Sequence, residues 1–304
     1  GFISASGILI AASQMKHVLG VKADGDTLAQ IVIGLASQLR AINLTTLTIG
    51  VLCLAFLFWV RRGLKPILTS AGLPPRLADM LAKAGPLAAI LVSTLLVAVL
   101  RLDEAGVKIV GSIPAGLPPF RVPDFDLELW QSLAGPALLI SLVGFVESVS
   151  VAQTLAAKRR QRIEPDQELL ALGMSNLGAA VSGGFPVTGG FARSVVNFDA
   201  GAATPMAGVL TAIGILVATM FFTPLFHFLP QAVLAATIIV AVLSLIDIAA
   251  MQRVWAYSRA DFLAMGATIV TVLAIGVEAG ILAGVVVSLL MFLWRTSRPH
   301  IAIV

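Results

Sequence analysis

The chain has 304 residues, of which 58% are hydrophobic and only 12% are charged, and its formal net charge is +4. Soluble domains carry about 25% charged residues, so a water-soluble protein of this composition would expose large apolar patches and aggregate. The composition therefore predicts a membrane protein with several spans and disfavours an unusually apolar soluble α/β domain.

Eight apolar runs are long enough, or nearly so, to cross a bilayer about 30 Å thick, which takes roughly 17 to 25 helical residues. In chain order they are Phe2–Leu19, Leu44–Val60, Pro86–Leu100, Leu133–Leu155, Leu169–Val181, Pro205–Phe222, Ala232–Ile248 and Phe262–Trp294. The last run would measure about 50 Å as one helix, too long for a single span. We predict that it forms a hairpin of two short, tilted helices that turns at residues 276–280.

The distribution of basic residues predicts the orientation of the chain. Lysine and arginine prefer cytoplasmic loops, and thirteen of them fall on one predicted side against six on the other. Loops 61–85 and 158–164 and the C-terminus are therefore expected in the cytoplasm, with the chain in a cell inner membrane. This bias accounts for the positive charge without a nucleic-acid partner, and contact with anionic lipid of the bilayer is the expected secondary role.

Residues 107–125 hold four prolines, which fix φ and disfavour helix. We expect this stretch to run extended across the outer surface. Two interpretations stay open: a plain connector, or a rigid strap that fixes two helix bundles relative to each other.

Chemistry that needs a metal or a nucleophile is not indicated. The lone cysteine cannot form an intrachain disulfide, and the three histidines are far apart in sequence. No nucleophile–base pair or cofactor motif is visible, so neither an enzyme nor a cofactor is expected. The cysteine is Cys53, and the histidines are His17, His227 and His300.

Glu147 interrupts the apolar run Leu133–Leu155. A carboxylate at that depth costs about 2.5–3.5 kcal/mol even on a lenient insertion scale, so such residues usually face the bundle interior and serve function. Ser148 and Ser150 make the neighbourhood polar. The alternative is a helix-packing carboxylic acid that burial keeps neutral.

A second interruption covers residues 182–203. We expect Asn176, Gly178 and the glycines and proline of 183–190 to destroy helix continuity, and residues 191–201 to restart a short helix. Irregular backbone survives at membrane depth only when it is buried in protein or lines a cavity. Discontinuous helices at the midplane are the usual substrate site of transporters.

The chemistry of this interruption favours an anion. A helix that begins near Gly190 points its free N–H groups and the positive end of its dipole at the break. Gly189 and Gly190 allow a ligand to approach the backbone, and Arg193 adds a permanent positive charge in the first turn. The alternative is a kinked structural helix whose Arg193 reaches to the headgroups.

These motifs resemble the sulfate permease (SulP) family of anion transporters. The similarity covers nearly the whole chain and is densest in Gly-Phe-Pro-Val-Thr-Gly-Gly-Phe-Ala-Arg-Ser-Val-Val-Asn at 184–197. Further matching stretches are residues 12–20, 111–120, 145–148, 168–176 and 200–205.

The resemblance implies an all-α membrane protein with fourteen segments in two inverted seven-segment repeats, which form a core and a gate domain. This chain would start in the fifth segment and lack the first four and a cytoplasmic STAS domain. The expected division is first-repeat gate segments at 1–103, an extended connector at 104–130, second-repeat core segments at 131–224 and second-repeat gate segments at 225–304. The unwound segment and half-helix fall around 183–200, and the complete protein is expected to form a homodimer.

The resemblance also implies roles for individual residues. Substrate would be bound by Gly189, Gly190, Phe191, Ala192, Arg193 and Ser194, and Glu147 would be the coupling residue. Many relatives have Ser in place of Ala192, so one side-chain donor is lost. Sodium-coupled members carry a hydroxyl one turn after the acid, where this chain has Val151, which favours proton coupling.

The sequence thus predicts a secondary transporter of small anions, such as sulfate, bicarbonate, chloride or a dicarboxylate, that works by an elevator-type movement. Two alternatives remain: a passive anion channel, and a nucleobase permease of the same general fold. The permease ranks lower because the half-helix offers Arg193 and no second acid. Without the upstream half-helix, the segment alone is not expected to transport.

Overall fold

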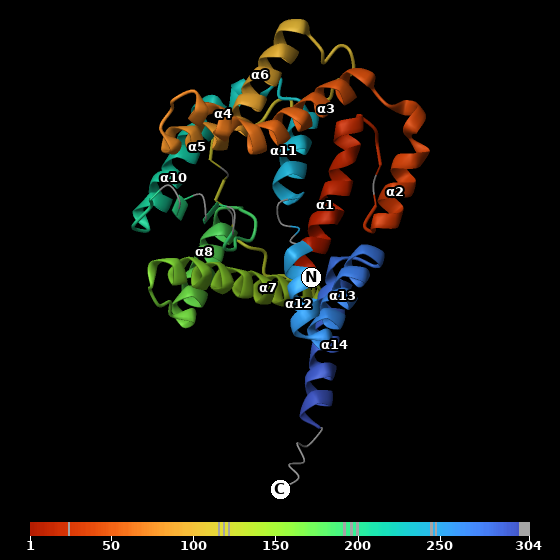
Figure 1. The fold of residues 1–304 in the computed structure, drawn as a ribbon, viewed down its shortest axis with the longest axis vertical. Helices are drawn as coiled ribbons and strands as arrows, with labels where there is room; N and C mark the ends of the chain where they lie inside the picture. The colour runs from red at the N-terminus through yellow and green to blue at the C-terminus, as the bar shows by residue number, and fades with distance from the viewer. Residues whose placement is uncertain are drawn as a thin grey trace. The chain divides into compact units, whose positions relative to one another are not determined.

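The computed structural model is helical along most of its length (Figure 1). It describes residues 1–23, 25–114, 116–117, 119–120, 122–190, 193–194, 197–198, 201–243, 246 and 248–297. The chain divides into two compact units: unit 1 is Gly1–Ile113 with Leu225–Val304, and unit 2 is Pro114–Pro224.

Unit 1 is built from two stretches of chain far apart in sequence. The first provides α1 (Phe2–Leu19), α2 (Leu28–Ser37), α3 (Leu44–Trp59), α4 (Lys65–Ser70), α5 (Pro75–Lys83) and α6 (Gly85–Leu100), and the second provides α11 (Gln231–Leu243), α12 (Ile248–Tyr257), α13 (Arg259–Ala274) and α14 (Val277–Thr296). A π-helical turn at Val60–Leu64 joins α3 to α4.

The core of unit 1 lies where α11 packs against α1 and α3. Buried side chains from these helices and α6, among them Cys53, Leu57 and Val233, form its centre. A small residue allows one of these close approaches: a Cβ added to Gly50 of α3 would lie 2.8 Å from a methyl carbon of Val18 in α1. Small residues at helix contacts are typical of membrane bundles, where packing replaces the hydrophobic effect.

The last apolar run forms two helices, as predicted, but its turn lies at Ile275–Gly276, and residues 277–280, which were predicted to turn, are helical. Helix α13 ends at Ala274, Gly276 takes a φ of 133°, and α14 begins at Val277 and packs along α13. Two glycines four residues apart on α14 let the helices touch, because a Cβ at Gly280 would clash with Val272 and one at Gly284 with Thr268.

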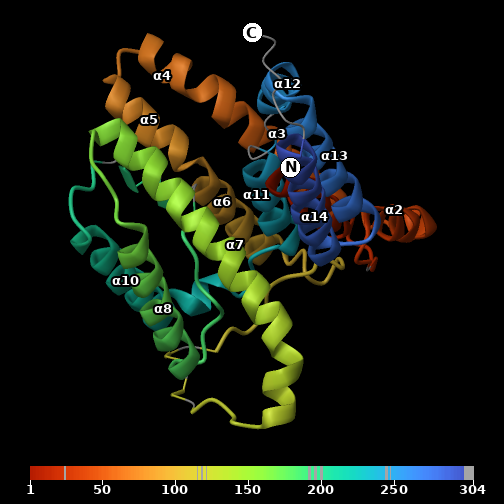
Figure 2. The same cartoon turned by 90° about the horizontal axis from the view of Figure 1, so that it is seen from below.

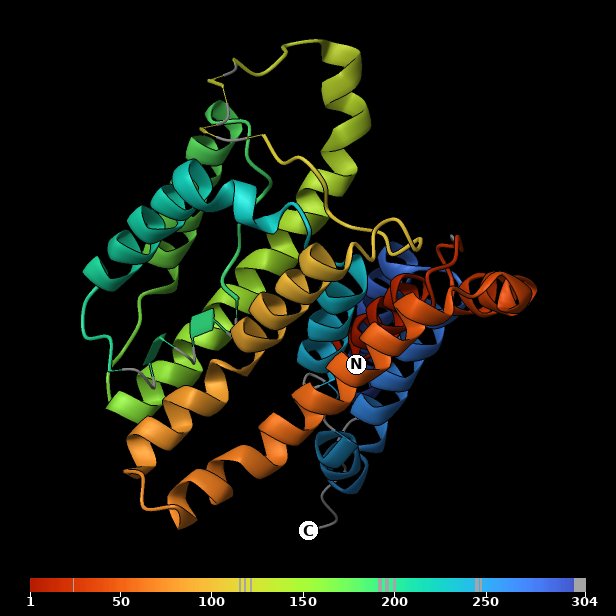
Figure 3. The same ribbon diagram turned by 90° about the horizontal axis from the view of Figure 1, so that it is seen from above.

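The proline-rich connector, which runs without helix between α6 and α7 (Figure 3), is fixed to unit 1 at its beginning. Val110 donates its N–H to the carbonyl of Leu229 at 2.9 Å, and Gly111 donates to His227 at 3.0 Å. Gln231 donates back to Lys108 at 2.9 Å. Residues 107–111 therefore pair with the chain that leads into α11, which a plain connector would not require.

Unit 2 contains α7 (Leu127–Arg159), α8 (Pro165–Val181) and α10 (Met206–Val217), followed by a π-helical turn at Ala218–Phe222. Helix α8 lies alongside α7 (Figure 2). Asp126 caps α7 by accepting the N–H of Glu128 at 3.0 Å, so the helix begins several residues before the apolar run. The domain roles of core and gate stay predictions.

Four helices in the described part of the chain are long and apolar enough to cross a membrane: Phe2–Leu19, Leu44–Ser70, Leu127–Arg159 and Met206–Phe226. A fifth candidate is the pair α5–α6, which bends by 48°. The apolar helix α2 has ten residues and was not predicted, because it is shorter than a span. Predicted loop 61–85 is a helical hairpin in which Asp79 binds Lys65 at 2.9 Å and Lys83 at 2.8 Å.

Candidate functional site

The predicted break in the helices is present between residues 182 and 190. Helix α8 ends at Val181, Gly183 takes a φ of 68°, and the N–H of Gly184 reaches back to the carbonyl of Ala179 at 2.7 Å. Glycine is the usual residue at such a left-handed helix end. Residues 184–190 then run without helix and form what is here called the non-helical segment.

The prediction that Asn176 and Gly178 interrupt the helix was wrong, because α8 continues through both. A glycine within a helix costs only about 1 kcal/mol relative to alanine. The Asn176 side chain instead binds the non-helical segment: Oδ1 accepts the N–H of Val187 at 2.9 Å, and Nδ2 donates to the carbonyl of Val187 at 2.9 Å. Nδ2 also donates to the carbonyl of Leu172 at 2.9 Å. This side-chain amide thus holds Val187 as a neighbouring β-strand would.

A chain of hydrogen bonds joins the non-helical segment to α7. Gly189 donates its N–H to Ser148 Oγ at 2.8 Å, and Thr188 Oγ1 donates to the carbonyl of Gly144 at 2.8 Å. The two hydroxyls lie 3.3 Å apart. Since the Thr188 proton is used by Gly144, Ser148 is the donor between the hydroxyls. The N–H of Gly189, the hydroxyls of Ser148 and Thr188 and the carbonyl of Gly144 therefore each have a hydrogen-bond partner.

Close backbone approach explains the glycine at position 189. A Cβ there would lie 2.7 Å from Ser148 Oγ and 2.9 Å from Ser148 Cα, closer than real side chains come. On α7, a Cβ at Gly144 would lie 3.1 Å from Thr188 Oγ1. Gly144 and Ser148 are both buried and lie one helical turn apart, so they share one face.

Helical backbone is described again at residues 193–194 and 197–198. The N–H of Ser194 donates to the carbonyl of Gly190 at 3.1 Å, the i to i−4 bond of an α-helical turn. The guanidinium of Arg193 folds back over the start of this turn, since a Cβ at Gly190 would lie 3.2 Å from Nε and 3.3 Å from Nη2. Arg193 is exposed. Its permanent positive charge lies beside Gly190, where the N-terminal end of a helical turn also carries a partial positive charge, and a ligand can reach it from solvent.

The other predicted binding residues have mixed outcomes. Phe191 and Ala192 lie outside the described residues. The N–H of Gly189 is taken by Ser148, and that of Ser194 by Gly190, so neither is free for a ligand. Gly189 instead brings the backbone against α7.

Glu147 lies on α7 next to Ser148 and is partly buried. Glu147 therefore directly precedes, in α7, the serine whose hydroxyl accepts the N–H of Gly189. Within the described ranges, no ion pair joins Glu147 to Arg193.

Sequence reasoning missed the anchoring roles of Gly144, Ser148, Asn176 and Thr188. One signal was available for two of them. A glycine and a serine four residues apart mark a small, polar stripe on one face of a helix, which suits close contact with another segment.

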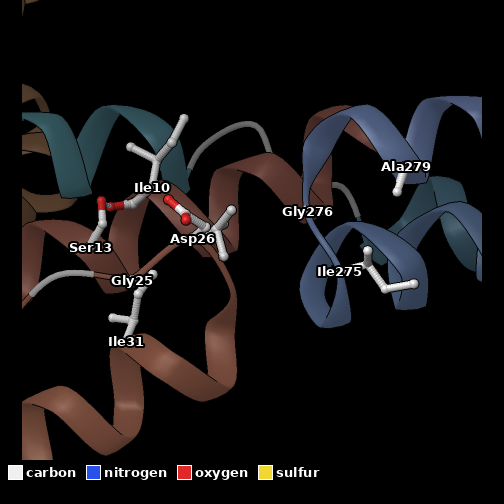
Figure 4. Close-up of a pocket in the computed structure, with 9 residues that line it drawn as sticks. Ile10, Ser13, Gly25, Asp26, Ile31, Ile275, Gly276 and Ala279 are labelled. Carbon is white, nitrogen blue, oxygen red and sulfur yellow. Dashed lines mark hydrogen bonds between the residues drawn. The ribbon is translucent and has the colours of Figure 1, made fainter.

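A separate cavity of about 680 Å³ lies within unit 1 (Figure 4). Ile10 and Ser13 of α1 meet the turn at Gly25–Asp26 and the α13–α14 turn at Gly276 there. Among the described residues that line it, Asp26 is the charged one, and a carboxylate does not suit an anion.

Comparison with known proteins places the chain in a family. Residues 1–268 match the sulfate permease family. The chain is 33% identical over 305 residues to sulfate transporter 4.1, chloroplastic, of Arabidopsis thaliana, covering all of the chain and 43% of that protein. It thus spans less than half the length of this relative.

Two solved structures share the fold. One is the mouse Solute Carrier 26 family member A9 anion transporter in the inward-facing state, with a TM-score of 0.85, 21% identity, and 98% of this chain and 47% of that chain covered. The other is the transmembrane domain of a cyanobacterial bicarbonate transporter, BicA, with a TM-score of 0.71, 21% identity, and 95% and 67% covered. The all-helical membrane fold is thereby confirmed, and the chain belongs to the sulfate permease family.

Proposed function

We propose that the complete gene product is a secondary transporter of small anions, with sulfate as the first candidate and bicarbonate, chloride and dicarboxylates as the others. The observation that carries this proposal is the guanidinium of Arg193 over Gly190, at the start of the half-helix. A helix N-terminus and a fixed cation both attract an anion, and arginine suits the oxygens of sulfate or carboxylate. The names of the Arabidopsis and cyanobacterial proteins support the same substrate class.

In this proposal, the anion binds Arg193 and the N–H groups of residues 190–193. Among the described residues, Ser194 donates its N–H to the carbonyl of Gly190, so the N–H of Ser194 itself is not offered to the anion. Gly144, Ser148, Asn176 and Thr188 hold the non-helical segment so that the start of the half-helix keeps its place.

Glu147 is the proposed coupling residue and takes up a proton. It is next to the contact between α7 and the segment, and Val151, one turn later, offers no hydroxyl for a sodium ion. Replacement by glutamine keeps the shape and removes the proton site. Uptake by Glu147→Gln should lose its dependence on an inward proton gradient, and an unchanged dependence would end the coupling proposal.

The remaining proposals concern arrangement and movement. Unit 2 would be the core that carries the substrate and unit 1 part of the gate, with elevator-type movement of one against the other. The protein would be a homodimer in a cell inner membrane, with loops 61–85 and 158–164 and the C-terminus in the cytoplasm. Labelling of single cysteines placed in these loops of a Cys53→Ser protein would test the orientation in intact cells.

Uptake of radiolabelled sulfate into proteoliposomes that hold the complete gene product tests the function. We expect accumulation against a sulfate gradient when the lumen is alkaline, and its loss with a protonophore. Uptake that only equilibrates would indicate a passive anion channel. Competition by uracil or xanthine, and none by bicarbonate, chloride or dicarboxylates, would indicate a nucleobase permease.

A further inference from the structure

The far end of the half-helix is fixed by its own backbone and by α7. Gly201 takes a φ of 92°, its N–H donates to the carbonyl of Phe198 at 3.0 Å, and the N–H of Ala202 donates to Asn197 at 3.1 Å. These paired bonds are those of a Schellman motif, which ends a helix. The described residues 197–198 and 201–202 thus form the C-terminal end of a helical turn.

Arg159, in the last turn of α7, contacts this end in two ways. Its Nη2 donates to the carbonyl of Ala202 at 2.6 Å, and its guanidinium carbon lies 4.6 Å from the centre of the Phe198 ring. Lys158 Nζ lies 5.6 Å from the same ring centre. The bond from Arg159 to Ala202 is a charge-assisted hydrogen bond, and the approach of Arg159 to the Phe198 ring is a cation–π contact; both are favourable.

The charge of Arg159 also suits its place. The C-terminal end of a helix carries a partial negative charge, which a cation stabilises. At the opposite end, Arg193 lies over the start of the half-helix and is left to face a ligand. Arg193 therefore lies beside Gly190, and Arg159 lies beside Phe198 and Ala202, at the two ends of the stretch 190–202.

Helix α7 holds the stretch 189–202 at two points, and the contacts follow the same order along α7 as along that stretch. Ser148 binds Gly189, and Arg159 binds Phe198 and Ala202. The two α7 residues are about 16 Å apart along a helix. A segment held at both ends on one helix cannot tilt without breaking one of the contacts.

We propose that Arg159 is a positioning residue for anion binding: by holding Phe198 and Ala202, it keeps the start of the half-helix and Arg193 aimed at the anion. This inference rests on the proposed transport function. It assigns Arg159 a role beyond the orientation signal and lipid contact that its basic loop predicts, and Arg159 does not itself touch the anion.

The test compares Arg159→Gln, Arg159→Lys and Phe198→Leu with the matched control Arg162→Gln. The control removes the same charge three residues later, in the loop after α7, at an exposed residue that is no part of these contacts. The complete gene product is studied in proteoliposomes for the KM and maximal rate of sulfate uptake, and in detergent for amide hydrogen exchange of the peptide covering 193–202.

We expect Arg159→Gln to raise KM about tenfold with a smaller change in maximal rate, and to speed exchange in 193–202. Phe198→Leu should act in the same direction but less, Arg159→Lys should restore part of the affinity, and Arg162→Gln should change neither measurement. If Arg159→Gln does not fold, the lysine and leucine variants decide by the same two measurements.

Wild-type KM and exchange in all the Arg159 and Phe198 variants would overturn the inference. So would an equal rise of KM in Arg162→Gln, or a rise that disappears in liposomes without anionic lipid, because both point to a surface-charge role. If the wild-type protein takes up no sulfate, the proposed function fails by itself, and the exchange measurement still shows whether Arg159 holds the half-helix.

Discussion

Replacing Gly189 with alanine adds a methyl group where the non-helical segment touches α7. The new carbon would lie 2.7 Å from Ser148 Oγ and 2.9 Å from Ser148 Cα. The oxygen belongs to a side chain that can rotate, but the Cα belongs to the backbone of a long helix. The segment must therefore move away, and the hydrogen bond from Gly189 to Ser148, now 2.8 Å, must lengthen.

The cost has two parts. Overpacking a tight contact typically costs 1–3 kcal/mol, so about 2 kcal/mol is a fair estimate. A lost hydrogen bond adds about 1 kcal/mol. The sum of about 3 kcal/mol corresponds to roughly a hundredfold change in an equilibrium constant, if all of it falls on the anion-competent arrangement.

Gly190→Ala is the matched control, because it adds the same methyl group one residue later. There the new carbon meets Nε and Nη2 of Arg193 at 3.2 and 3.3 Å, the far end of a flexible, exposed side chain. The guanidinium can swing aside at a cost of about 0.5–1 kcal/mol for a displaced rotamer. We expect a loss of affinity of only a few-fold.

The assay is sulfate binding by isothermal titration, with thermal unfolding measured in parallel. Gly189→Ala should bind sulfate roughly a hundredfold more weakly or unfold at a lower temperature, and Gly190→Ala should stay close to wild type in unfolding. Equal affinity and stability for Gly189→Ala, or a larger drop of the unfolding temperature in Gly190→Ala, would refute the packing of the segment against Ser148.

Replacements at three further positions test contacts away from the arginine. Asn176→Leu removes both bonds to Val187 and should weaken sulfate binding about tenfold, whereas Asn176→Asp, which keeps one acceptor, should be intermediate by the same titration. Thr188→Val keeps the shape but removes the hydroxyl between Ser148 and the Gly144 carbonyl, and should lower stability by about 1–2 kcal/mol in denaturant unfolding; no change would show that this bond is not formed. Gly280→Val should separate α13 from α14 and lower the thermal midpoint, and an unchanged midpoint would contradict their close contact.

Four of the predicted spans, the final pair of helices and the break after α8 were predictable because each follows from local sequence. Apolar runs fix the spans, and the glycine at 276 with its positive φ fits the turn between α13 and α14. The helix break was predicted too early, since Asn176 was read by its propensity. Its amide is used by Val187, eleven residues away, and propensity carries no information about such a partner.

The anchoring contacts of the site could not be predicted for the same reason. Gly189 and Ser148 are far apart in sequence, and the residues around each of them do not indicate that the two are in contact. The pairing of Val110 with Leu229 is likewise a backbone contact between distant stretches, which leaves no mark in composition. The position of Arg193 just after the glycine pair can be seen in the sequence, and its role in binding an anion stays a prediction.

The central claim, that the anion is held by Arg193 at the start of the half-helix, is tested most directly by sulfate titration of Arg193→Gln and Arg193→Lys. We expect that glutamine abolishes measurable binding, that lysine keeps a weaker part of it because the charge remains without the planar fork, and that both variants unfold near the wild-type temperature because Arg193 is exposed. Wild-type affinity in Arg193→Gln would contradict the binding role of Arg193.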